Sequence, residues 1–174
     1  DGTICVYVPR TADVILDAAG YVPAESDYTP LTPVRLADTR AGFVSADGLF
    51  TGTGAVPSEG TIEVQIAGRA GIPADAEAVV VNLTATRAAT NGYATAFPCG
   101  TQPPTSSVNY QTFDSIANEL VAKLSPDGRI CVYVHRTAQV ILDVAGYMPA
   151  TSDYTALTPA RLADTRPGFV AADS

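Results

Sequence analysis

Residues 127–147 read DGRICVYVHRTAQVILDVAGY, and residues 1–21 read DGTICVYVPRTADVILDAAGY. The similarity extends further, because residues 1–48 align with residues 127–174 without a gap and differ at 11 of the 48 positions. Asp1 aligns with Asp127, so the period is 126 residues (127 − 1). Such a period is too long for one coil of a solenoid and has the size of a whole domain. The sequence therefore predicts a tandem repeat of complete domains.

The repeated stretch has the pattern of two β-strands. Ile130–Val134 alternates β-branched and aromatic residues, and Gln139–Val144 contains the apolar run VILD. Their copies, Ile4–Val8 and Asp13–Ala18, predict the same two strands. The other predicted strands are Thr61–Ala67, Ala78–Thr86, Tyr93–Pro98, Ser106–Tyr110 and Glu119–Leu124. The 14 glycines and 13 prolines are spread between these segments, as expected for short strands joined by turns.

One segment fits two periods. Residues 114–124 place apolar side chains at near-helical spacing, but they also alternate with period two. We favour a strand, because the Asp127-Gly128 turn then forms a hairpin into Ile130–Val134. The expected fold is all-β, an antiparallel β-sandwich of the jelly-roll or immunoglobulin-like type.

The expected domain boundaries lie in polar, proline-rich segments. Pro23–Pro33 and its copy Pro149–Pro159 are predicted to be short, partly extended linkers. We therefore expect a complete β-sandwich module at residues 28–153. Residues 1–27 would be the C-terminal hairpin of a preceding repeat, and residues 154–174 the N-terminal part of the next. A module of this size has a radius of gyration near 14 Å, so an axial repeat of roughly 35–45 Å is expected.

Composition and motifs exclude several function classes. The net charge is −8 with no basic run, which argues against nucleic acid as a partner. No apolar stretch approaches the roughly 18 residues of a membrane span. His135 is the only histidine and its repeat copy is Pro9, which has no acid–base chemistry. No catalytic, metal-binding or phosphate-binding motif is present in the sequence, so we expect no enzyme, no metal and no cofactor.

The cysteines predict a disulfide. Residues 28–153 contain Cys99 and Cys131 and no other cysteine, so these two are the expected pair. Two separate buried thiols are the alternative. Cys5 is the copy of Cys131, and we expect its partner in a preceding repeat or a neighbouring copy.

A motif of alternating charge, RLADTR, supplies Arg35, Asp38 and Arg40, and Asp143 ends an apolar strand. A carboxylate on a mostly buried strand needs a partner, and an arginine fork is the best one. We expect a structural Arg–Asp network in which Asp143 pairs with Arg35 or Arg40. A sugar or ion site is the alternative. The motif returns at Arg161, Asp164 and Arg166.

These strings together resemble a known kind of repeat. RLADTR, VQIAGRAGIPADAEAVVVNLTAT, PCGTQPPTSSVNY, DGRICVY and VILDVAGY are similar to a tandem β-module of secreted and cell-surface proteins of high-GC Gram-positive bacteria. The resemblance covers the full period and implies a secreted or cell-surface location, but no particular activity.

The expected function is structural: a module of a long extracellular fibre or stalk, with neighbouring copies or repeats of the same module as partners. Copy number gives such an array both reach and multivalency. An adhesin or glycan-binding module, with surface glycans as partners, is the second hypothesis. An accessory domain of a secreted hydrolase is the third.

Overall fold

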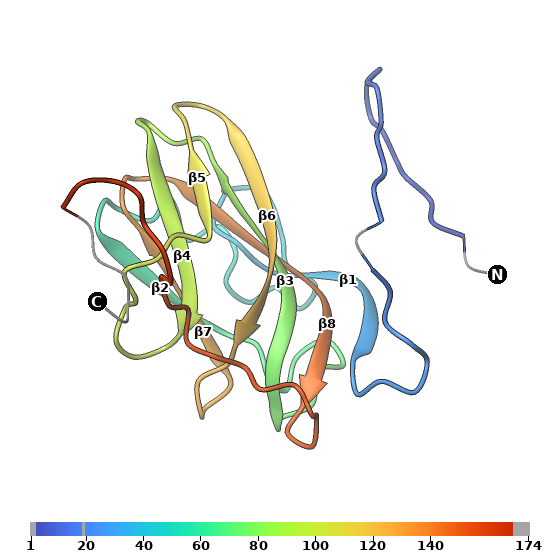
Figure 1. Cartoon of the computed structure of the whole chain (residues 1–174). Helices are drawn as coiled ribbons and strands as arrows, with labels where there is room; N and C mark the ends of the chain where they lie inside the picture. The colour runs from blue at the N-terminus through green and yellow to red at the C-terminus, as the bar shows by residue number, and fades with distance from the viewer. Residues whose placement is uncertain (1–2, 19, 169–174) are drawn as a thin grey trace.

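The computed structural model describes residues 3–18 and 20–168. Residues 1–2, 19 and 169–174, which belong to the two expected flanking pieces, lie outside the described residues. The described residues form no helix and eight strands in two antiparallel four-stranded sheets (Figure 1). The strands are β1 (Thr29–Asp38), β2 (Gly60–Gln65), β3 (Ala76–Thr86), β4 (Gly92–Pro98), β5 (Val108–Tyr110), β6 (Ser115–Lys123), β7 (Arg129–Val134) and β8 (Gln139–Pro149).

The strand order is that of a hairpin rolled up on itself. One sheet has the order β1-β8-β3-β6 and the other has the order β2-β7-β4-β5. The first strand therefore pairs with the last, the second with the seventh, the third with the sixth and the fourth with the fifth. This nesting is the jelly-roll arrangement, and it differs from the immunoglobulin order of strands.

The core lies between the two sheets and follows the alternation of the strands. On β7, Ile130, Val132 and Val134 are fully buried, and on β8, Val140 and Leu142 are fully buried as well. Each such side chain contributes roughly 1.5–3 kcal/mol on burial. Both strands are central in their sheets, so the repeated stretch supplies the middle of the domain.

Most of the predicted strands are present. The segments at 61–67, 78–86, 93–98 and 106–110 correspond to β2, β3, β4 and β5. The ambiguous segment at 114–124 is a strand, β6. The expected linker at Pro23–Pro33 is partly wrong, because β1 already begins at Thr29. The two prolines in this part of β1 argued against a strand. β1 lies at the edge of its sheet, however, where a missing backbone N–H is tolerated.

The N-terminal copy of β7 and β8 forms no strand in residues 3–18 and 20–27. Ile4 is 80% exposed and Ile15 is 83% exposed, whereas their copies Ile130 and Ile141 are 0% and 6% exposed. The strand pattern is the same, but the neighbouring strands of the sandwich are already paired with β7 and β8. An isolated hairpin is marginally stable in water, which accounts for the difference from the two predicted strands.

The chain enters and leaves the sandwich at the same end (Figure 1). Thr29 at the start of β1 pairs with Tyr147 near the end of β8. The hydroxyl of Tyr28 donates to the carbonyl of Ala145 at 3.1 Å. The two linker copies also touch, because the backbone N–H of Asp153 donates to the carboxylate of Asp27 at 3.0 Å. We call this end, formed by residues 22–29 and 147–154, the terminal pole.

A substitution at Gly146 tests whether Tyr28 packs against β8 at this pole. A Cβ at Gly146 would collide with the ring of Tyr28, whereas a Cβ at its repeat copy, Gly20, would meet nothing within 4 Å. We expect Gly146→Ala to lower the free energy of unfolding by roughly 1–3 kcal/mol, as overpacking does. The matched variant Gly20→Ala should leave it unchanged. Denaturant titrations measure both, and equal effects of the two variants would contradict the pairing of Tyr28 with β8.

Candidate functional site

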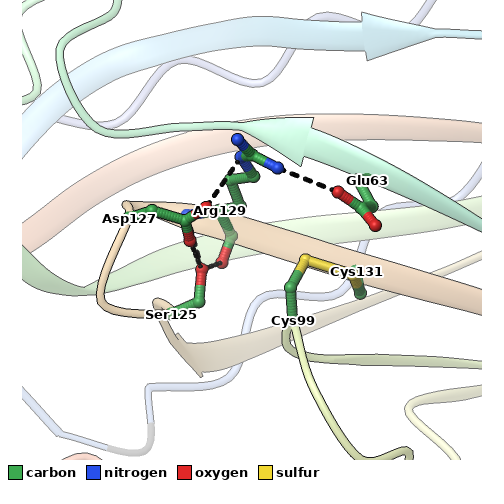
Figure 2. The surroundings of a disulfide bond; sticks show 6 residues. All are labelled: Glu63, Cys99, Ser125, Asp127, Arg129 and Cys131. Carbon is green, nitrogen blue, oxygen red and sulfur yellow. Dashed lines mark hydrogen bonds and ion pairs between the residues drawn. A yellow bond between two sulfur atoms is a disulfide. The ribbon is translucent and has the colours of Figure 1, made fainter.

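The structure joins Cys99 and Cys131 in a disulfide (Figure 2). Cys131 lies on β7 and is buried, and Cys99 follows directly after β4, the strand that pairs with β7. Their Cα atoms are 4.9 Å apart and 32 residues separate them in sequence. Cys5 is an exposed free thiol. The bridge therefore ties neighbouring strands of one sheet together, as expected from the cysteine count.

Charged side chains surround the disulfide on the outer face of this sheet (Figure 2). Arg129 contacts Glu63 on β2 at 3.0 Å and Asp127 in the preceding turn at 3.1 Å. The hydroxyl of Ser125 donates to Asp127 and holds that turn. Because the partners of Arg129 are more than half exposed, these pairs contribute little to stability.

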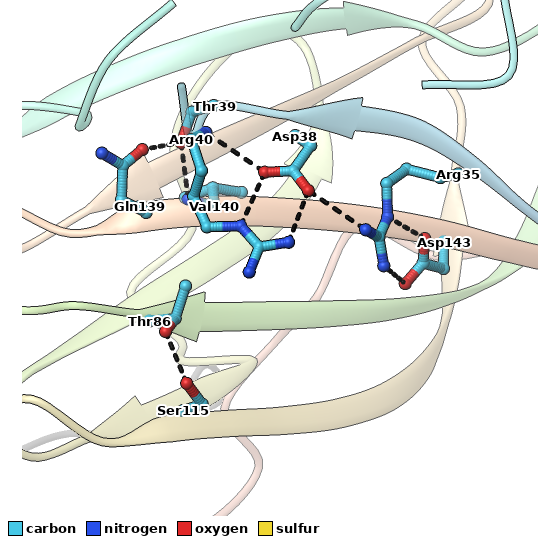
Figure 3. Close-up of polar contacts among 9 residues, drawn as sticks. All are labelled: Arg35, Asp38, Thr39, Arg40, Thr86, Ser115, Gln139, Val140 and Asp143. Atoms are coloured by element: carbon cyan, nitrogen blue, oxygen red, sulfur yellow. Dashed lines mark hydrogen bonds and ion pairs between the residues drawn. The ribbon is translucent and has the colours of Figure 1, made fainter. Parts of the chain in front are cut away.

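The four residues expected to form an Arg–Asp network lie together at β1 and β8 (Figure 3). Of the two favoured arginines, Arg35 is the one that contacts Asp143. Its Nε and Nη2 atoms donate to the two carboxylate oxygens at 2.8 and 3.1 Å, a bidentate pair across the two strands. The Nη1 atom of Arg35 also donates to Asp38 at 3.1 Å.

Asp38 is the fully buried centre of this network. It accepts hydrogen bonds from the backbone N–H, Nε and Nη2 of Arg40 at 3.1, 2.9 and 2.6 Å. Burial alone would raise the pKa of Asp38, but the hydrogen bonds and charge of Arg40, with the charge of Arg35, outweigh burial and lower the pKa. The charged form is thus stabilised in the fold, and this contribution is lost as the pH falls through the lowered pKa.

The copy of the motif forms the same local contacts although it belongs to no strand and lies against the outside of the sandwich, beside Tyr93 and Asn109. Arg166 donates to Asp164 through its backbone N–H, Nε and Nη2, and Arg161 contacts Asp164 at 3.1 Å. The Arg–Asp–Arg part is therefore encoded locally by the spacing of RLADTR. The bond to Asp143 is what the tertiary fold adds, and it holds β1 against β8.

A polar row crosses the outer face of the sheet that contains this network. Arg35 pairs in register with Asp143, Asp143 with Asn82, and Asn82 with Glu119, one residue on each of the four strands. The four side chains line a groove of about 540 Å³. The row places a cation, two carboxylates and an amide side by side at the surface.

Asn82 and Glu119 are not among the site residues predicted from the sequence. Asn82 lies in the predicted strand Ala78–Thr86 and is half-buried on the outer face, whereas its neighbours Val81 and Leu83 are fully buried. The period-two alternation of β3 carried this signal, since an amide between two buried aliphatic residues faces the opposite side. Glu119 is exposed and has no such signal in the sequence.

His135 lies beside an aromatic ring, and its Nδ1 atom is buried without a hydrogen-bond partner in the described part of the chain. The ring of His135 stacks on the ring of Tyr93, with 4.8 Å between the centroids. Among residues 3–18 and 20–168, no three His, Cys, Asp or Glu side chains are grouped so that they could hold a metal ion. In the same residues, no helix has the length and apolar character needed to cross a membrane.

Comparison with known proteins adds no relative: no family model and no curated protein matches the sequence.

The contribution of the disulfide to stability can be measured, because the bridge closes a loop in the unfolded chain. Closing a loop of this length removes unfolded-state entropy worth about 3–4 kcal/mol. We therefore expect Cys99→Ala, made in a Cys5→Ser background, to lose that much unfolding free energy in a urea titration. Cys5→Ser alone is the matched control and should unfold like the unmodified chain. A loss of equal size in both variants would contradict the assignment of Cys131 as the partner of Cys99.

Proposed function

We propose that this chain is a stretch of an extracellular tandem array of β-sandwich modules, with a structural role as a fibre or stalk. One observation carries the proposal. A completed sandwich is flanked on both sides by close copies of its own strands, 126 residues away in each direction. The preceding copy repeats β7 and β8, and the following copy repeats β1.

The exposure of the flanking copies supports a role as parts of further modules. In the described residues before β1, large apolar side chains are exposed whose copies are buried in the sandwich, among them Leu16 at 69% against Leu142 at 0%. After β8, Leu162 is 75% exposed and its copy Leu36 is fully buried. Burial of such side chains is the main driving force for folding, so each copy gains stability by completing a sandwich.

The disulfide and the negative net charge support a location outside the cell. Disulfides persist in oxidising compartments and are rare in the cytosol, and the module contains one between Cys99 and Cys131. The net charge of −8 favours repulsion between copies and solubility.

The terminal pole sets the spacing of the array. A chain that crosses each module would give the axial repeat of 35–45 Å expected from size, but this chain leaves next to where it enters. From Tyr147 to Thr155, the copy of Thr29, eight residues span at most about 29 Å. Adding one strand spacing of about 5 Å gives at most roughly 34 Å per repeat. Because the module itself is roughly 36 Å wide, successive modules must lie on different sides of the linker path.

Concatemers of the 126-residue period test this proposal. We expect particles of two, four and eight periods to lengthen linearly in electron micrographs, by no more than about 34 Å per period. Duplicating residues 150–155 in every linker should add up to about 20 Å per period, because the linker sets the spacing. Increments near about 45 Å, or a linker insertion without effect, would refute the arrangement, and compact particles that do not lengthen would refute the array.

A further inference from the structure

We infer that each module lengthens the array under tension, by peeling β1 away from β8 until the disulfide stops the extension. The inference rests on the proposed array, because there the linker passes tension from β8 of one module to β1 of the next. It concerns a mechanical function that a rigid spacer would lack.

The direction of loading follows from the terminal pole. Tension acts on the chain before Thr29 and after Tyr147, which are paired neighbours at one end of an antiparallel pair. Hydrogen bonds between antiparallel strands lie perpendicular to the strands. Pulling two neighbouring ends apart therefore loads the first bonds along their own direction and breaks them one after another. Pulling opposite ends would load all bonds of the pair at once.

The loaded end of β1 is weakly paired. Pro30 and Pro33 have no N–H to donate, and the register with β8 shifts between Pro30 and Val34. The hydrogen bond from Tyr28 to Ala145 supplements the ladder at this end. β1 is also an edge strand, so it can leave without disrupting a second neighbour in its sheet.

The Arg–Asp network is the next barrier. Arg35 holds Asp143 on β8 with a bidentate contact, and peeling must break this contact before β1 is free, whereas the contact of Arg35 with Asp38 lies within β1. Further along, the hydroxyl of Thr39 accepts from the N–H of Val140 at 2.9 Å (Figure 3). The order of contacts therefore runs from weak at the pole to strong in the middle of the strand.

The disulfide limits how far the module extends. About 120 residues lie between Thr29 and Pro149, and the bridge between Cys99 and Cys131 bypasses 32 of them. An oxidised module should release roughly 320 Å of chain, and a reduced one roughly 430 Å, at up to about 3.6 Å per residue. The disulfide thus keeps about a quarter of the extensible length closed.

Single-molecule force spectroscopy on the full chain tests the inference. In one geometry the handles are attached at the two chain ends, residues 1 and 174. In the other geometry the handle at residue 174 stays in place, and the handle at residue 1 moves to Ala41, beyond the end of β1 that lies away from the pole. β1 and β8 are then pulled from opposite ends. At equal loading rate we expect a lower unfolding force in the first geometry, with a contour-length gain of roughly 320 Å that rises to roughly 430 Å with reductant.

Equal forces in the two geometries, or a higher force for the end-to-end pull, would overturn the inference. A contour-length gain that does not change with reductant would overturn the limit set by the disulfide. The length of resting concatemers does not depend on these results, so a rigid module would leave the proposed array intact.

Two variants locate the barrier. Tyr28→Phe removes one hydrogen bond at the loaded end and should raise the end-to-end unfolding rate at constant force about fivefold, the effect of one net hydrogen bond. The control Glu63→Gln removes the exposed contact with Arg129 between β2 and β7 and should leave the rate unchanged. An unchanged rate in Tyr28→Phe, or equal acceleration in both variants, would show that the module does not open at the pole.

Discussion

The pairing of the first strand with the last is the constraint on which the rest of the structure depends. In the rolled hairpin, β1 lies beside β8, so the chain must enter and leave at one end of the sandwich. Two polar contacts help to secure this pair beside the buried Leu36 of β1: Tyr28 with Ala145, and Arg35 with Asp143. β8 is also paired with β3, so it links β1 to the other strands of their sheet.

Much of the fold could be predicted because the repeat and the alternation are local signals. The fully buried Val132 and Leu142 lie in strands that the sequence pattern marks clearly. The disulfide followed from counting cysteines within one period, which removed Cys5 from consideration. The Arg–Asp–Arg geometry of RLADTR recurs at 161–166, so this part is set by spacing alone.

The features that could not be predicted depend on which segments pair as strands. A repeated sequence does not determine this pairing, because both copies carry the same strand pattern. Ile4–Val8 has the pattern of β7 and remains unpaired, because the neighbours of β7 in the sandwich already pair with Arg129–Val134. The first half of β1 was not predicted because its prolines argue against a strand. The edge position of β1 in its sheet accommodates these prolines. The row that brings Asn82 and Glu119 beside Asp143 depends on the register between strands far apart in sequence.

Residues 129–149, and not their copy at 3–23, complete the sandwich of β1 to β6. Peptide mapping of the oxidised, unreduced chain distinguishes the two arrangements, because each gives Cys99 a different partner. The structure predicts a peptide that links Cys99 to Cys131, with Cys5 recovered as a free thiol. A peptide that links Cys99 to Cys5, with Cys131 free, would show that the preceding copy occupies the sandwich instead.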